Sequence, residues 1–310
     1  MPTIHPDLAA ATWPAAADPQ AAARGMEELA TEIAAAGGPD DGLADAMRSP
    51  EGEAALGALF GNSPFLANCV HRDPAFAARL LRDGPDAALD SVFAAMASAA
   101  AARTTGDELS RALRVARRRA ALAIALADIA GLWALERVTA ALSGFADRAI
   151  GLAVADQLRV LAASGAIALA DEDAPERGSG LVVLGMGKLG GRELNYSSDV
   201  DLIVLYDLER VRAADQDTLQ RSFVRLVRGV VKLLEERTGD GYVLRTDLRL
   251  RPDPGATPLA MSTDAAEFYY ETLGQNWERA AMIKARPVAG DVEAGDAFLA
   301  RLRPFLWRRH

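Results

Sequence analysis

The chain is poor in the residues on which thiol and imidazole chemistry depends. Its 310 residues include one cysteine, Cys69, and three histidines, His5, His71 and His310. A single cysteine excludes an intrachain disulfide framework and a zinc site built from several cysteines. The histidines are scattered and lie far in sequence from the glycine-rich segment described below. A Ser-His-Asp or Cys-His mechanism therefore has little support.

Positive charge is also scarce. The chain has 34 Lys and Arg against 43 Asp and Glu, which gives a formal net charge of −9. A general nucleic-acid binder would carry a basic surface, so a polymerase acting on nucleic acid is the least favoured function. The most apolar run, Ala120 to Leu135, contains Asp128 and is too short to span a bilayer. Because no signal-peptide pattern opens the sequence, we expect a cytoplasmic protein that neither spans nor binds a membrane.

Residues 1–175 are rich in alanine and other strong helix formers, and we predict a helical region there. We expect breaks between its helices near Gly37-Gly38-Pro39, Gly61-Asn62-Ser63-Pro64, Gly84-Pro85 and Thr104-Thr105-Gly106. A polar, turn-rich stretch over 171–180 marks the boundary to a second domain, residues 176–310. The pattern there predicts strands over 181–184, 200–206 and 242–250, and helices over 219–236 and within 263–303. The predicted fold class is α+β.

The most informative segment is a glycine-rich turn followed by paired acids. Gly187 and Lys188 belong to the turn, and Asp199 and Asp201 open the next apolar run. In a strand, residues i and i+2 project from the same face, so both carboxylates point at one spot. Asp247, on a later predicted strand, adds a third acid. Three convergent carboxylates repel one another unless cations lie between them, so we predict that Asp199, Asp201 and Asp247 form a catalytic Mg²⁺ site.

Neighbouring residues suit phosphate binding. We expect Gly187 and Lys188 to cradle phosphate oxygens, and Ser198 to orient a phosphate or cap the strand end. Arg249 and Arg251 follow Asp247, and arginine binds phosphate bidentately, although a solvated charged surface explains the same pattern. The glycines also match the dinucleotide-binding pattern, but no βαβ repeat surrounds them.

Three segments resemble one family closely. They are residues 185–203 (GMGKLGGRELNYSSDVDLI), 245–252 (RTDLRLRP) and 277–286 (WERAAMIKAR). They are similar to the bifunctional glutamine synthetase adenylyltransferase/adenylyl-removing enzymes, and the resemblance covers most of residues 60–310. It implies a polymerase-β-like nucleotidyltransferase domain with a small mixed sheet flanked by helices. The family enzyme carries two copies of this domain, and this sequence contains one. Its segment 277–286 and its long helical lead-in are similar to the N-terminal copy, so we expect the N-terminal, adenylyl-removing part of such an enzyme, truncated at the C-terminus.

The resemblance implies an activity and partners. Inorganic phosphate would attack the AMP carried by a tyrosine of glutamine synthetase, giving ADP and the active synthetase, and so contribute to the control of nitrogen assimilation. Glutamine synthetase as protein substrate, a PII-type regulatory protein, and phosphate and ADP or ATP would be the partners. Two alternatives stay open: a nucleotidyltransferase with a small-molecule acceptor, and a non-catalytic module that docks on glutamine synthetase.

Overall fold

The computed structural model describes residues 4–36 and 42–307, which divide into two compact units. The first comprises Met1–Ala97 and Val115–Leu142, and the second comprises Ser98–Arg114 and Ser143–His310. This division differs from the boundary predicted at residue 175. Residues 98–114 and 143–163, from the region predicted as helical, group with the strands in the second unit.

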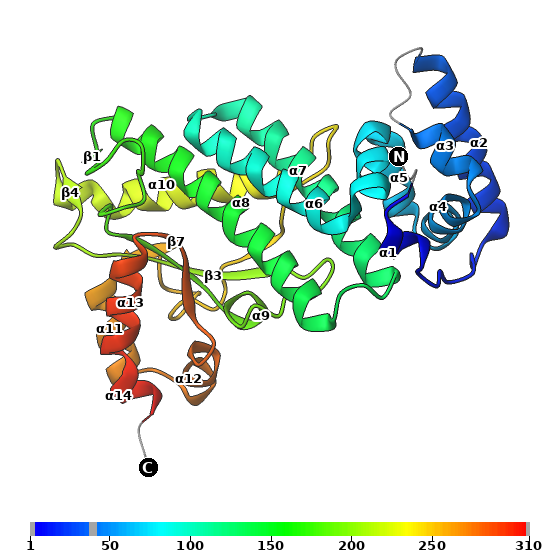
Figure 1. Cartoon of the computed structure of the whole chain (residues 1–310). Coiled ribbons are helices and arrows are strands. Elements are labelled where there is room, and N and C mark those ends of the chain that lie inside the picture. The colour runs from blue at the N-terminus through cyan, green and yellow to red at the C-terminus, as the bar shows by residue number, and fades with distance from the viewer. Residues whose placement is uncertain (1–3, 37–41, 308–310) are drawn as a thin grey trace. The chain divides into compact units, whose positions relative to one another are not determined.

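The first unit is helical, as its composition predicts. The helices that contribute to it are α1 (Pro6–Ala9), α2 (Pro19–Ala36), α3 (Leu43–Arg48), α4 (Pro50–Asn62), α5 (Pro64–Arg72) and parts of α6 (Pro74–Ala101), α7 (Gly106–Ile129) and α8 (Leu135–Ala163) (Figure 1). Ser63 caps α5 by accepting a hydrogen bond from the Leu66 amide, and Gly84 interrupts α6 with a φ of 86°. The predicted breaks at these two points are therefore confirmed. The predicted break at 37–39 lies outside the described residues.

The second unit is built on a five-stranded sheet. Its strands are β2 (Leu181–Gly185), β3 (Val200–Tyr206), β5 (Thr246–Asp247), β6 (Ala260–Ser262) and β7 (Arg286–Gly290). The order is β5-β3-β2-β7, and β6 also pairs with β3. Strands β3 and β7 run antiparallel to β2, whereas β5 and β6 run parallel to β3. The predicted α+β class with a small mixed sheet is therefore confirmed. A separate two-stranded sheet joins β1 (Ile167–Ala168) to β4 (Arg212–Ala213).

Helices cover both faces of the five-stranded sheet. They are α9 (Gly187–Gly190), α10 (Gln216–Glu235), α11 (Thr263–Thr272), α12 (Asn276–Met282), α13 (Val292–Arg301) and α14 (Arg303–Leu306) (Figure 1). On one face, Phe223 of α10 stacks on Tyr206 with ring centroids 4.9 Å apart. On the other face, Leu184 and Ile203 share a core with Phe298 of α13. Burial on both faces explains why β2 and β3 are apolar at nearly every position.

Two predictions about the second unit are wrong. Residues 242–250 do not form one strand, because only Thr246–Asp247 pairs with β3. The amides of Val243 and Leu244 both donate to the Leu234 carbonyl at the end of α10, so they are not available to a sheet. Residues 286–290, which fall within the 263–303 stretch predicted as helical, instead form edge strand β7, where Pro287 is tolerated.

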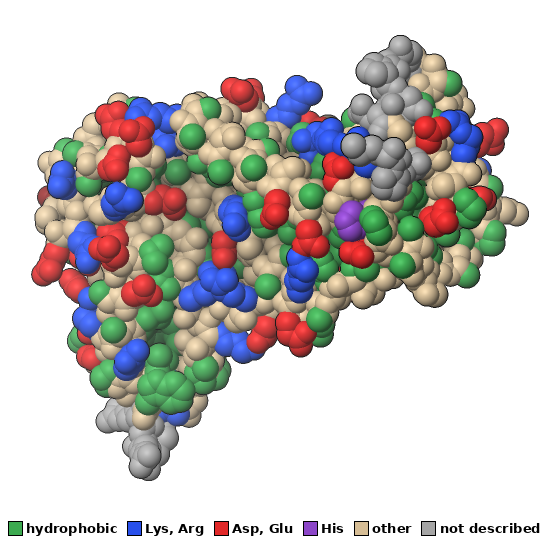
Figure 2. Space-filling model, viewed as in Figure 1, with side chains coloured by type: hydrophobic (Ala, Val, Ile, Leu, Met, Phe, Trp, Pro, Cys, Tyr) green, Lys and Arg blue, Asp and Glu red, His purple; other side chains and the backbone are tan. Residues whose placement is uncertain are grey.

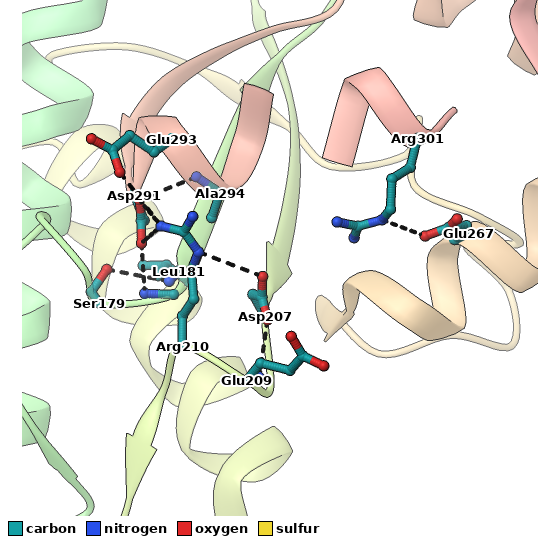
Figure 3. A network of polar contacts seen from close by, with 11 residues as sticks. Ser179, Leu181, Asp207, Glu209, Arg210, Glu267, Asp291, Glu293, Ala294 and Arg301 are labelled. Atoms are coloured by element: carbon teal, nitrogen blue, oxygen red, sulfur yellow. Dashed lines mark hydrogen bonds and ion pairs between the residues drawn. The ribbon is translucent and has the colours of Figure 1, made fainter. Parts of the chain in front are cut away.

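A polar network joins the start of α13 to the strands (Figure 3). Asp291 is buried, and its carboxylate accepts hydrogen bonds from the amides of Ala294 at 3.2 Å and Gly180 at 3.3 Å. The Arg210 guanidinium lies 3.3 Å from the same carboxylate and 3.9 Å from Asp207. A buried carboxylate needs such partners to remain charged. The network therefore fixes α13 against the start of β2, the strand whose other end leads into the glycine turn.

Hydrophobic side chains are unevenly buried in this unit. They gather visibly over the C-terminal helices in Figure 2. The exposed members on α11 to α14 and their connections include Phe268, Leu273, Trp277, Ile283 and Trp307. Helix α8 is long and apolar enough to cross a membrane by length and composition, but half of its most apolar stretch is buried. Core helices pass the same test, so this is weak support for a membrane span.

Candidate active site

Three acids meet where β3 begins. Asp201 on β3 lies directly opposite Asp247 on the parallel strand β5, and Asp199 precedes Asp201 by two residues. Burial raises the pKa of Asp201, and the neighbouring charges of Asp247 and Asp199 raise it further. The register of the sheet thus brings Asp201 and Asp247 together, and Asp199 lies just before β3. Asp201 is the member whose negative charge is least well solvated.

Arginines neutralise the other two acids. The Nε of Arg245 lies 2.5 Å from Asp199 Oδ1, and the Nε of Arg249 lies 2.9 Å from Asp247 Oδ2. The hydrogen bond from Arg249 lowers the pKa of Asp247. Both guanidinium groups thus lie beside the acids, within reach of an anion bound there. Arg245 is a residue that the sequence reasoning missed as a site residue, although it stands two positions before Asp247.

The glycine turn touches the acidic cluster directly. Gly187 has a φ of 51°, and a side-chain Cβ placed on it would lie 3.1 Å from Asp201 Oδ2. The Met186 amide donates to the Asp201 carbonyl at 2.9 Å. Backbone conformation and lack of space both favour glycine at 187, which allows the turn to approach the carboxylate.

Lys188 and Ser198 meet across the loop after α9. Lys188 Nζ lies 3.3 Å from Asn195 Oδ1 and 3.5 Å from Ser198 Oγ, and the Ser198 hydroxyl also donates to Asn195. Asn195 was missed by the sequence reasoning; its position inside the glycine-rich segment was the available signal. The three side chains place an ammonium group and a hydroxyl group on the rim of the acidic cluster.

Arg251 has a different environment from the one predicted. Its guanidinium donates to the carbonyls of Leu248 at 2.8 Å, Pro254 at 2.8 Å and Thr257 at 3.3 Å. These bonds fold the loop after β5, and they leave Arg251 directed at backbone oxygens. Phosphate binding by Arg251 therefore has no geometric support beyond its sequence position, whereas Arg249 lies at the acids.

Arg286 holds the end of the glycine turn through its backbone carbonyls. The Arg286 guanidinium donates to the carbonyls of Leu189 at 3.0 Å and Gly190 at 3.2 Å, at the end of α9. It also pairs with Asp147 of α8 at 2.8 Å. Cations are favourable at carbonyl ends of helices because those oxygens lack helical partners. Arg286 therefore positions the turn and does not point at the acids.

A pocket of about 550 Å³ opens beside Asp199 and Asp247. Its lining includes Val231 and Glu235 of α10, then Arg237, Tyr242 and residues 245–249. The Arg237 guanidinium lies 5.5 Å from the ring centroid of Tyr242, a cation–π contact within this lining. Arg237, Tyr242 and Glu235 were not predicted as site residues, because nothing in the sequence links the end of α10 to the acids.

The donor set suits a hard divalent cation, although two of the acids are engaged by arginines. Among the residues that the structure describes, no group of three or more His, Cys, Asp or Glu side chains is arranged to hold a metal ion. Arg245 and Arg249 form ion pairs with Asp199 and Asp247. Carboxylate oxygens are the ligands that Mg²⁺ prefers. The chemistry of the three acids therefore fits Mg²⁺, provided that Arg245 and Arg249 move aside.

Comparison with known proteins gives one family. Residues 54–301 match the family model described as glutamate-ammonia ligase adenylyltransferase. Three relatives are named bifunctional glutamine synthetase adenylyltransferase/adenylyl-removing enzyme: one from Rhodopseudomonas palustris strain TIE-1, 48% identical over 84% of this chain; one from Rhizobium meliloti strain 1021, 48% identical over 82%; and one from Bradyrhizobium sp. strain BTAi1, 50% identical over 80%.

The matches cover only part of those relatives. The aligned residues span 26% of the first two proteins and 25% of the third, so this chain spans about a quarter of the length of the curated relatives it matches. The family match, in contrast, takes in all three acids, the glycine turn and Arg286. The resemblance inferred from the three sequence segments is confirmed: the chain belongs to the glutamate-ammonia ligase adenylyltransferase family.

Proposed function

We propose that this chain removes AMP from a tyrosine of adenylylated glutamine synthetase by phosphorolysis. An oxygen of inorganic phosphate attacks the phosphorus of the AMP group, and the bond from phosphorus to the tyrosine oxygen breaks. The products are ADP and the unmodified synthetase, whose tyrosinate takes up a proton. The single observation that carries the proposal is the placement of Asp201 opposite Asp247 and against Gly187, in a member of this family.

Asp199, Asp201 and Asp247 would hold Mg²⁺ in this reaction. When bound, the metal would neutralise charge on the transferred phosphoryl group and on the departing oxygen. Arg249 and Arg245 lie close enough to bind phosphate oxygens once they leave the acids. Lys188 and Ser198 offer a cation and a hydroxyl group on the Gly187 side.

The remaining features of the proposal come from the family. Glutamine synthetase is the protein substrate, a PII-type protein is the regulator, and the reaction takes place in the cytoplasm. These assignments are proposals because the chain spans about a quarter of its relatives. The names of those relatives include both addition and removal of AMP, so the test must measure both directions.

The test incubates the chain with adenylylated glutamine synthetase, Mg²⁺ and phosphate, and measures ADP. We expect ADP only when phosphate is present, and none from the Asp199→Ala/Asp201→Ala variant. The matched control is Asp217→Asn, an exposed acid in the first turn of α10, which should leave the rate unchanged. A parallel reaction supplies ATP and unmodified synthetase. AMP incorporation in that reaction, without ADP formation in the first, would replace our proposal with adenylylation.

A further inference from the structure

The acidic cluster has two separate neighbours. Gly187 approaches Asp201 on one side, and Asp201 does not line the pocket described above. The pocket instead includes Asp199 and Asp247 among its lining residues. Phosphorolysis of a nucleotide has two ligands to place at the same metal site, the nucleotide and the phosphate. The structure thus offers a distinct surface for each.

The pocket has a chemistry that the glycine turn lacks. Val231 and Leu248 give it aliphatic walls, and Tyr242 gives it an aromatic ring that lies under the Arg237 guanidinium. Tyrosine rings and arginine planes are surfaces on which nucleic-acid bases stack. Its volume of about 550 Å³ falls within the usual range for small-molecule sites. A ligand that suits both the acids and the walls of this pocket carries a phosphate group and a flat, partly apolar ring system.

Glu235 links this pocket to strand β5. Its Oε1 accepts hydrogen bonds from the Thr246 amide and the Thr246 hydroxyl, both at 2.6 Å. Glu235 also lines the pocket. The exocyclic amine of a base can donate a hydrogen bond to a carboxylate. The end of α10 therefore both positions the strand that carries Asp247 and supplies an acceptor for a base.

We propose that Tyr242, backed by Arg237, is the stacking platform for the base of the nucleotide whose phosphate lies at Asp199 and Asp247. This inference rests on the proposed function, because it takes the acids as the place of the phosphoryl group. It assigns the base to the α10 side of the cluster, and it leaves the Gly187 side for inorganic phosphate. Tyr242 then fixes the nucleotide without contacting the reacting atoms.

Calorimetric titration in the presence of Mg²⁺ tests the platform with three probes. ADP carries a base, pyrophosphate carries only the phosphates, and phenyl phosphate stands for a tyrosyl phosphate. For Tyr242→Ala we expect ADP to bind about tenfold more weakly, with pyrophosphate and phenyl phosphate unchanged within about twofold. Tyr242→Phe keeps the ring and should bind ADP as the unmodified chain does. Phe268→Ala, at an exposed aromatic on α11, is the matched control and should change nothing.

The other outcomes are distinct. ADP binding that is unchanged in Tyr242→Ala would overturn the platform while leaving the proposed function standing. A loss confined to phenyl phosphate would assign the pocket to the tyrosine side chain of the protein substrate. Equal weakening of all three probes, in Tyr242→Phe as well, would show a structural effect and no stacking. If the unmodified chain binds neither ADP nor pyrophosphate, the platform and the proposed function both fail.

Discussion

Arg245 and Asp199 form an ion pair, with Arg245 Nε 2.5 Å from Asp199 Oδ1, at the position where a metal-binding carboxylate is needed. Both side chains are about half exposed, at 50% and 51%. The pair is therefore accessible to water and to dissolved cations. It makes the guanidinium a competitor of any divalent ion for the same oxygen.

The first prediction concerns this competition. Arg245→Gln removes the positive charge, so Mn²⁺ used as a probe should bind about threefold more tightly in the absence of phosphate, a small factor because exposed ion pairs are weak. Titration monitored by electron paramagnetic resonance measures the dissociation constant. Arg221→Gln, an exposed arginine on α10, is the control for net charge. Unchanged or weaker Mn²⁺ binding in Arg245→Gln would rule out the competition.

A second prediction concerns the contact between Gly187 and Asp201. Gly187→Ala places a methyl group near the carboxylate in a left-handed backbone conformation, so it should lower the free energy of unfolding by about 1–2 kcal/mol. Urea denaturation measures this change. Gly57→Ala is the opposite case, because Gly57 lies inside α4 with nothing within 4 Å of the added atom. That control should stabilise by about 0.5–1 kcal/mol, and destabilisation of both variants alike would refute the steric argument.

The third prediction concerns Arg286 as a positioning residue. Arg286 joins Asp147 to the carbonyl end of α9, and both side chains are about one-fifth exposed. Removal of either residue leaves the charge of the other without its partner. The loss of unfolding free energy in the double variant should therefore differ from the sum of the losses in Arg286→Ala and Asp147→Ala. We expect a coupling energy of about 1–3 kcal/mol from this double-mutant cycle. Additive effects would mean that the two residues act independently.

A fourth prediction concerns pH. Burial raises the pKa of Glu176 from 4.5 to about 7, although the Gly290 amide donates to its Oε1 at 2.7 Å. Between these two pH values the folded protein holds a proton that the unfolded chain has lost. The contribution of Glu176 to the free energy of unfolding is therefore fully present below pH 4.5. It is lost as the pH rises from 4.5 through 7, by about 3 kcal/mol at most.

Urea denaturation from pH 5 to pH 8 measures this dependence. Glu176→Gln keeps an oxygen for the Gly290 amide but does not ionise, so it should reduce the fall in stability with rising pH. Glu209→Gln, at an exposed position, should retain the slope of the unmodified chain. A Glu176→Gln variant with that same slope would contradict the assignment.

The sequence by itself determined the elements with strong local signals. Strand Val200–Tyr206 has the predicted bounds, and helix Gln216–Glu235 nearly so, because continuous apolar residues and amphipathic spacing reflect burial directly. The two-residue period of a strand predicted Asp199 close to Asp201, and, besides burial and the charge of Asp247, the charge of Asp199 does raise the pKa of Asp201. The family followed from three segments of sequence, and the match over residues 54–301 confirmed it.

Only the tertiary structure decided which side chains surround the acids. The parallel pairing of Thr246–Asp247 with β3 sets Asp247 opposite Asp201, and no local pattern specifies a partner strand. The residues before Thr246 do not extend strand β5, because the amides of Val243 and Leu244 donate to the Leu234 carbonyl of α10. Tyr242 lines the pocket, and Arg251 donates to carbonyls of its own loop. The pairing of β5 with β3 joins residues that are distant in sequence, so the chain must fold before they meet.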